Sequence, residues 1–137
     1  MATINQTAPA ATAAVWTGRI LSGVVILFLL VDGAMKLVPL DIVTQTMQQL
    51  GYPPNANLAR LLGLLTLAGT LLYAYPRTSI LGAIVLTGYM GGAMATHLQA
   101  GSPVFSHLLF GFYLGLMIWG GLYLRDERLR TLIPFRL

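Results

Sequence analysis

The sequence contains no cysteine, and charged residues make up only 9% of its 137 positions. The lack of cysteine excludes disulfides, thiolate metal sites, Cys-X-X-Cys redox chemistry and cysteine nucleophiles in this chain, and it leaves the redox compartment undetermined. A soluble domain is usually about a quarter charged, whereas 56% of this chain is hydrophobic and its mean hydropathy is +0.75. This composition excludes disorder and argues against an ordinary water-soluble domain.

Four long apolar stretches take up well over half of the chain. A membrane-spanning helix needs about 20 mostly apolar residues. Stretches of that kind run from about Trp16 to Val38, from Leu58 to Tyr75, from Ser79 to Leu98 and from Val104 to Leu124. The last two connections are short, so the helices they join must be antiparallel. The sequence therefore predicts an all-α fold, an integral membrane four-helix bundle over residues 16–124 without a second domain.

The two ends of the chain differ in composition. Residues 1–15 are rich in Ala and Thr and are predicted to form a flexible N-terminal tail. They carry no Lys or Arg, and no convincing cleavage site accompanies the apolar core. We therefore interpret the first span as retained rather than as a cleaved signal peptide. Residues 125–137 are predicted to be a basic cytoplasmic tail whose arginines meet anionic lipid head groups.

The connection between the first and second spans is longer. Pro39 cannot continue the preceding helix. Apolar residues then recur at spacings of three and four, at Leu40, Val43, Met47 and Leu50. This stripe predicts a short amphipathic helix that lies flat on the membrane or caps the bundle, with a plain structured loop as the alternative. Gly51 and the prolines after it would end that helix.

Basic residues near the span ends predict the orientation in the membrane. One side of the predicted bundle holds Arg19, Arg77, Arg125, Arg128, Arg130 and Arg136, and the other holds only Lys36 and Arg60. This bias places both termini in the cytoplasm. It also accounts for the net charge of +4 without nucleic acid, for which no basic surface interleaved with aromatic residues is present.

The most informative residue is Asp32, which lies inside the first span near its outer end. An ionised carboxylate in lipid is costly and normally faces protein or water. Lys36 follows one helical turn later on the same face, so the two charges can neutralise each other. Two interpretations stay open. One is a structural ion pair with Lys36 reaching outward to the interface, and the other is a polar cavity that binds or protonates a ligand.

Further polar side chains fall in the same outer half of the predicted bundle. The candidate ligand-binding residues are Asp32, Lys36, Arg60, Tyr89, Thr96, His97, His107 and Tyr113. Acid, base, imidazole and phenol groups together are typical of a proton-coupled or ligand-binding site, whereas each histidine alone is equally typical of the membrane interface. The two histidines lack H-x-x-x-H or E-x-x-H spacing. No metal and no resident cofactor are therefore predicted in the chain itself, while a bound quinone is compatible with it.

Two pairs of glycines, each four residues apart, mark the third and fourth spans. They are Gly88 with Gly92 and Gly111 with Gly115. Small residues let helix backbones approach closely in lipid. We predict that these glycines pack helices together within the bundle, and contact between two protomers is the alternative.

Several motifs follow one another in a fixed order along the chain. The first span ends Asp32-Gly33-Ala34-Met35-Lys36-Leu37, a Gly51-Tyr52-Pro53 turn follows, Leu62-Gly63 lies early in the second span, and Tyr75-Pro76-Arg77 precedes a third span that closes on His97. In this order they resemble the DoxX-like family of small four-span bacterial membrane proteins. The resemblance implies the bacterial inner membrane. Because the family's namesakes are associated with thiosulfate:quinone oxidoreductase subunits, it also implies a quinone-facing or redox-accessory role.

Three functions stay open on the sequence alone. The first is a redox-accessory or quinone-binding protein, with a membrane redox partner, in which Asp32 and His97 exchange protons beside an apolar cavity. The second is a non-catalytic binding or transport module, in which Lys36 and Arg60 attract a weakly acidic molecule. Four spans without an inverted repeat are few for a transporter acting alone. The third is a structural subunit that anchors a partner protein, and a homo-oligomer is compatible with each function.

Overall fold

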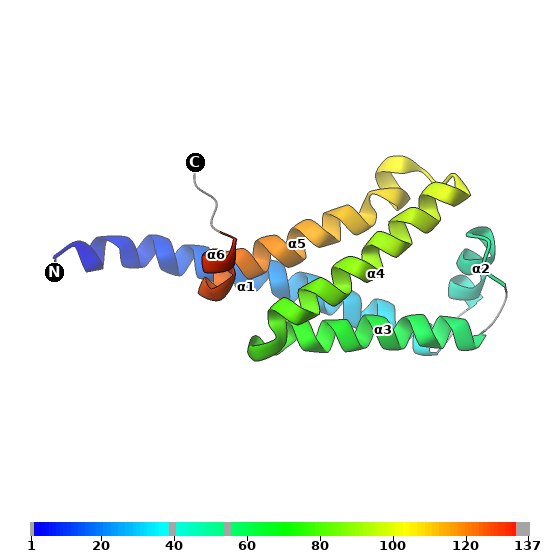
Figure 1. The fold of residues 1–137 in the computed structure, drawn as a ribbon, viewed down its shortest axis with the longest axis horizontal. Coiled ribbons are helices and arrows are strands. Elements are labelled where there is room, and N and C mark those ends of the chain that lie inside the picture. The colour runs from blue at the N-terminus through cyan, green and yellow to red at the C-terminus, as the bar shows by residue number, and fades with distance from the viewer. Residues whose placement is uncertain (1, 39–40, 54–55, 134–137) are drawn as a thin grey trace.

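The computed structural model describes residues 2–38, 41–53 and 56–133. Its helices are α1 (Ala2–Leu37), α2 (Asp41–Gln49), α3 (Ala56–Ala74), the 3-10 turn η1 (Pro76–Thr78), α4 (Ser79–Ala100), the π-helical turn η2 (Val104–Leu108), α5 (Phe110–Arg125) and α6 (Glu127–Leu132) (Figure 1). The described residues contain no strand. Four segments are long and apolar enough to cross a membrane: Thr12–Leu37, Asn57–Ala74, Pro76–Ala100 and Val104–Arg125. The predicted all-α membrane bundle is confirmed.

The four spanning helices form a ring in which each packs against two neighbours. α1 contacts α3 and α5, and α4 contacts the same two helices. Consecutive spans run in opposite directions, so α1 and α4 end where α3 and α5 begin. α2 lies at this end of the bundle, called the α2 end below, and α6 lies at the opposite, α6 end (Figure 1).

The side chains of the spans divide into an inner and an outer set. Val25, Leu86, Ile118 and Leu122 are fully buried where the helices meet. Large apolar side chains such as Leu27, Leu71 and Leu116 are instead more than half exposed. A soluble protein would bury such residues, whereas a membrane helix turns them toward lipid tails. The exposed apolar belt therefore supports a protein embedded in the bilayer.

Glycines bring the helix backbones close together, most tightly where α3 and α4 meet next to η1. A Cβ built on Gly82 would lie 2.2 Å from the backbone nitrogen of Tyr73 and 2.5 Å from its Cα. Only a residue without a side chain fits this crossing. Four more glycines form two further crossings of α1, with α5 and with α3: Gly18 with Gly121, and Gly33 with Gly63.

The packing within the bundle predicted for the paired glycines in the third and fourth spans is largely wrong, and their contact between two protomers stays a prediction. A Cβ on Gly88, Gly92 or Gly115 would meet nothing within 4 Å, and only Gly111 approaches a neighbouring helix, at Met94 of α4. The spacing of two glycines is visible in sequence. The position at which two helices cross depends on the whole bundle. Spacing alone therefore did not identify the glycines that lie at the helix crossings.

The short amphipathic helix predicted after the first span is present as α2. Met47 is 7% exposed, and Val43 and Leu50 are half-buried on the same face. Gly51 ends the helix with φ of 89°, and the N–H groups of Gly51 and Tyr52 donate to carbonyls of the last turn. Pro39 and Leu40, which the prediction also used, lie outside the described residues.

Both ends of the chain are more helical than the sequence suggests. α1 begins at Ala2, so the backbone of residues 2–15 is helical and continues the first span. Alanine has the highest helix propensity, and adding turns to a formed helix is easier than starting a new one. The flexibility of this segment stays a prediction. Residues 134–137 of the predicted basic tail, Arg136 among them, lie outside the described residues.

α6 folds the described part of the predicted tail against the bundle. Asp126 caps α6 by accepting a hydrogen bond from the backbone nitrogen of Arg128 over 2.9 Å. The Arg128 guanidinium binds the same carboxylate and donates to the carbonyl of Pro76, while Arg130 donates to two carbonyls of α5 and Leu129 is buried. The side-chain hydrogen bond from Arg128 lowers the pKa of the Asp126 carboxyl. Two of the arginines predicted to meet lipid head groups, Arg128 and Arg130, thus form hydrogen bonds within the protein.

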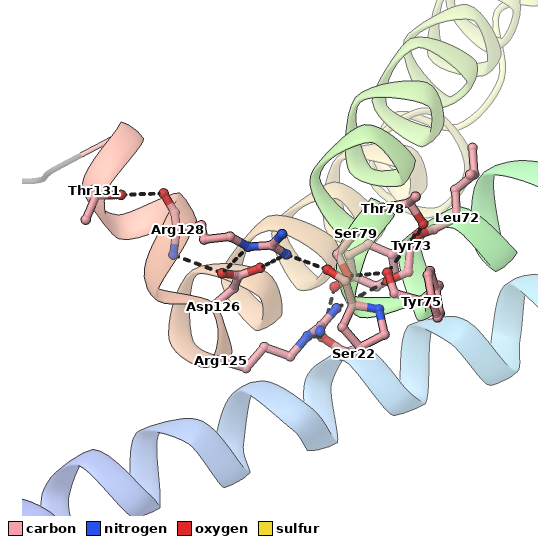
Figure 2. A network of polar contacts seen from close by, with 11 residues as sticks. Ser22, Leu72, Tyr73, Tyr75, Thr78, Ser79, Arg125, Asp126, Arg128 and Thr131 are labelled. Carbon is pink, nitrogen blue, oxygen red and sulfur yellow. Dashed lines mark hydrogen bonds and ion pairs between the residues drawn. The ribbon is translucent and has the colours of Figure 1, made fainter.

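Ser22, Tyr73 and Arg125 form a chain of hydrogen bonds that joins α1, α3 and α5 at the α6 end (Figure 2). Arg125 Nε donates to Ser22 Oγ over 2.9 Å, and Tyr73 OH donates to the carbonyl of Ile118 over 2.7 Å. A phenol has one proton, so Ser22 is the donor in the 2.9 Å hydrogen bond between the two hydroxyls. Each of these buried polar groups is satisfied by protein, as a water-poor environment requires.

Candidate functional site

Two adjoining cavities lie at the α2 end of the bundle. The larger has a volume of about 610 Å³, and its lining comes from α1, α2, α3 and α4, with Tyr52 from the turn after α2. The smaller has a volume of about 170 Å³ and lies toward α5 and η2. The lining of the larger cavity is mostly apolar, with Met35, Val43, Met47, Leu50 and Leu62 among its residues. A cavity of this size and lining is typical of a small-molecule site.

A polar wall separates the two cavities, defined by the five residues that line both: Asp32, Lys36, Tyr89, Ala93 and His97. Lys36 Nζ donates to Asp32 Oδ2 over 2.6 Å and to the Tyr89 hydroxyl over 2.9 Å. The ammonium nitrogen also lies 5.3 Å from the centroid of the Tyr89 ring. α1 therefore provides the two charges, and α4 provides the phenol that completes the cluster.

The hydrogen bonds of the polar wall leave donors available to a ligand. Because Tyr89 accepts from Lys36, its own proton is not used in that contact, and no acceptor for it occurs among the described residues. Lys36 has three N–H groups, and two of them are accounted for by Asp32 and Tyr89. Donors next to a charge form the stronger kind of hydrogen bond. The cluster can therefore present an N–H and an O–H to an acceptor oxygen.

The two histidines flank the smaller cavity. Their ring centroids are 6.0 Å apart with an edge-to-face arrangement. His97 Nδ1 lies 3.0 Å from Ser102 Oγ, and His107 Nδ1 lies 2.8 Å from Ser106 Oγ. Each imidazole keeps its second ring nitrogen outside these contacts. No group of three or more His, Asp or Glu side chains able to hold a metal ion occurs in the part of the chain that the structure describes.

Six of the eight residues predicted for the site line one or both cavities: Asp32, Lys36, Tyr89, Thr96, His97 and His107. The other two lie elsewhere. Arg60 is exposed and donates to Asn57 Oδ1 over 3.2 Å on its own helix. Tyr113 is 41% exposed and donates to the carbonyl of Phe105 over 3.2 Å. The sequence indicated the depth of these two residues in the membrane but not the side of the helix on which they lie.

Sequence reasoning missed Tyr52, which closes the larger cavity together with the predicted residue Thr96. Thr96 Oγ1 donates to the carbonyl of Gly92, so Tyr52 is the donor in the 3.1 Å hydrogen bond between its hydroxyl and Thr96. This contact joins the turn after α2 to α4. Gly88 and Gly92, predicted as helix-packing residues, instead form part of the cavity lining. The Gly-Tyr-Pro turn was visible in sequence, but its contact with a residue 44 positions away was not.

The polar groups at the two ends of the bundle differ in whether they can still form hydrogen bonds with a ligand. At the α6 end, Ser22 and Tyr73 are buried and fully hydrogen-bonded, and neither lines a cavity described above. At the α2 end, the ion pair is accessible from the cavities, with 20% of the Lys36 side chain and 34% of the Asp32 side chain exposed. The first arrangement holds helices together. The second can exchange hydrogen bonds with a molecule in the cavity.

Four spanning helices around a mixed polar and apolar cavity define a small multi-pass membrane protein. The model of the DoxX-like family matches residues 20–121, so the chain belongs to this family and the resemblance is confirmed. No curated protein and no solved structure matches the chain.

Proposed function

We propose that the protein binds a membrane-dissolved amphiphilic small molecule in the larger cavity, with a quinone as the favoured class. The observation that carries this proposal is the position of the Asp32–Lys36–Tyr89 cluster on the wall of an otherwise apolar cavity of about 610 Å³. A charged pair inside a spanning segment is expensive and is usually retained for a function. A cavity of this kind matches a ligand with one polar head and a hydrocarbon body.

The charges of the cluster favour a neutral head group. Asp32 neutralises Lys36 at 2.6 Å, so the site as a whole attracts a carboxylate weakly. Arg60, which could have added positive charge, lies outside both cavities. An N–H from Lys36 and an O–H from Tyr89 fit a carbonyl oxygen of the quinone type. The redox-accessory role that the family resemblance implies agrees with such a ligand, whereas transport of an acidic molecule is disfavoured by the same charges.

Binding of decylubiquinone to the protein in lipid nanodiscs tests this proposal. We expect saturable binding by the wild type, weaker binding of laurate, and a loss of about 2- to 10-fold in decylubiquinone affinity for Tyr89→Phe, because one hydrogen bond is removed. Tyr113→Phe is the matched control, since the Tyr113 hydroxyl bonds outside the cavities. Tighter binding of laurate would favour an acidic ligand, and no binding of either compound would favour a structural subunit.

We further propose that the α6 end faces the cytoplasm of a bacterial inner membrane. The described α6 end holds five arginines, Arg19, Arg77, Arg125, Arg128 and Arg130, whereas the described α2 end holds Lys36 and Arg60. Basic residues flanking spans are retained on the cytoplasmic side. Green fluorescent protein fused after Leu137 should fluoresce in cells, and alkaline phosphatase at the same position should stay inactive. The reverse pattern would place the polar wall toward the cytoplasm.

A further inference from the structure

The larger cavity extends from the α2 end of the bundle toward the middle of the membrane. Lys36 lies one residue before the end of α1. Gly88, which lines the same cavity, lies twelve residues before the end of α4 at Ala100. At 1.5 Å per residue this is about 18 Å along the helix, and the hydrocarbon core is about 30 Å thick. Tyr89 follows Gly88 on α4 and accepts a hydrogen bond from Lys36, so the polar head site and the glycine side of the cavity both lie at hydrocarbon depth.

The cavity is open on the side where α2 faces α4. Ile42 and Thr46 of α2 and Gly88 and Gly92 of α4 line the cavity, and all four are also exposed at the protein surface. Ile42 is 61% exposed. A Cβ on either glycine would meet nothing within 4 Å, so no described side chain from another helix packs directly against this part of the wall. Because Gly88 and Gly92 lie at hydrocarbon depth, the exposed glycine wall faces lipid rather than water.

One polar contact between described residues spans this opening. The main packing of α2 is against α3, and Tyr52 reaches from the turn after α2 to donate to Thr96 on α4. A single neutral hydrogen bond contributes only modestly to stability. It can therefore limit the width of the opening while allowing it to widen.

We propose that the ligand enters the larger cavity sideways from the bilayer, between α2 and the glycine face of α4 formed by Gly88 and Gly92, and that the Tyr52–Thr96 hydrogen bond latches this entrance. The inference rests on the proposed function, because it concerns access to that same cavity. The bound molecule would keep its head at Lys36 and Tyr89 while its tail leaves the cavity past Gly88 and Gly92 into the bilayer. The ligand class is accordingly an amphiphile with a tail longer than the cavity can enclose.

The association rate of decylubiquinone with the protein in nanodiscs tests the entrance directly. Gly92→Val places a branched side chain in the opening, and a steric mismatch of this size is expected to slow association about tenfold or more. Gly91→Val is the matched control, because Gly91 lies next to it on α4, has nothing within 4 Å and lines neither cavity. Tyr52→Phe removes the latch and should speed both association and dissociation about 2- to 10-fold.

The outcomes separate the entrance from the binding site. If Gly92→Val and Gly91→Val associate at the same rate, or if Gly92→Val weakens affinity through dissociation alone, the entrance is overturned and the proposed function stands. If the wild type does not bind the quinone, both proposals are overturned. Thermal unfolding establishes that each variant is folded. Should Gly92→Val not fold, Gly92→Ala and Tyr52→Phe provide the same comparison, and unchanged rates in both would overturn the entrance.

Discussion

Gly82→Ala should strongly lower the thermal unfolding temperature of the purified protein. Among the substitutions that add a single methyl group, we expect this one to cause the largest loss of stability. The added Cβ would lie 2.2 Å from the backbone nitrogen of Tyr73 and 2.7 Å from the backbone carbon of Leu72. Both neighbours are main chain, so no side chain can rotate away, and α3 and α4 must separate. Overpacking typically costs about 1–3 kcal/mol, and we expect the upper end or more here.

Gly91→Ala is the matched control for this substitution. Gly91 lies on the same helix, and a Cβ there would meet nothing within 4 Å. Both substitutions gain the same helix propensity of about 1 kcal/mol in a helix interior. The difference between their unfolding temperatures therefore measures the effect of the close contact between α3 and α4. Equal unfolding temperatures, measured by circular dichroism in one detergent, would show that the backbones of α3 and α4 are not in close contact at Gly82.

Lys36→Met should abolish quinone binding and also destabilise the protein. Without Lys36, the Asp32 carboxylate has no hydrogen-bond donor among the described residues. Breaking a fully buried ion pair costs about 3–5 kcal/mol. These side chains are 20% and 34% exposed, so we expect about 1–3 kcal/mol after solvent screening. Asp32→Asn should be milder, because the amide oxygen can still accept from Lys36, which also keeps its hydrogen bond to Tyr89.

The double variant Asp32→Asn with Lys36→Met separates a structural pair from a binding group. It leaves no unpaired charge, so its unfolding temperature should recover most of the loss caused by Lys36→Met. If the cluster binds the ligand head, the recovered protein should still fail to retain decylubiquinone. A double variant that regains stability and binds the quinone as the wild type does would assign the pair a structural role only. Arg60→Met is the control, because Arg60 lies outside both cavities.

The fold could be read from the sequence because its main signals are local. Long apolar runs locate the spans, and Gly51 marks the end of α2. The spacing of Asp32 and Lys36 predicted a contact that the structure confirms at 2.6 Å. Tyr89 and Thr96 could be assigned to one side of the third span for the same reason, since helical periodicity fixes relative rotation within a single helix.

The features that the sequence did not reveal depend on contacts between helices. Arg60 and Tyr113 are at the expected depth but turn away from the cavities, because the rotation of one helix relative to the others is set by packing. Ser22 and Tyr73 are ordinary polar residues in their own helices, and they form a network only because residues 51 positions apart meet. The helix crossings likewise determine which of the glycines are packed and which are open.

The tight crossing at Gly82 also acts on the geometry of the opposite end of the bundle. α3 and α4 meet beside η1, where Gly82 lies, and they move apart toward the α2 end (Figure 1). Gly92 lies ten residues beyond Gly82 along α4, which is about 15 Å from the crossing. A small change in the angle between α3 and α4 at this crossing would therefore displace the cavity-lining part of α4 by a larger distance. A change in the crossing angle at Gly82 would therefore change the cavity volume, although Gly82 lines neither cavity.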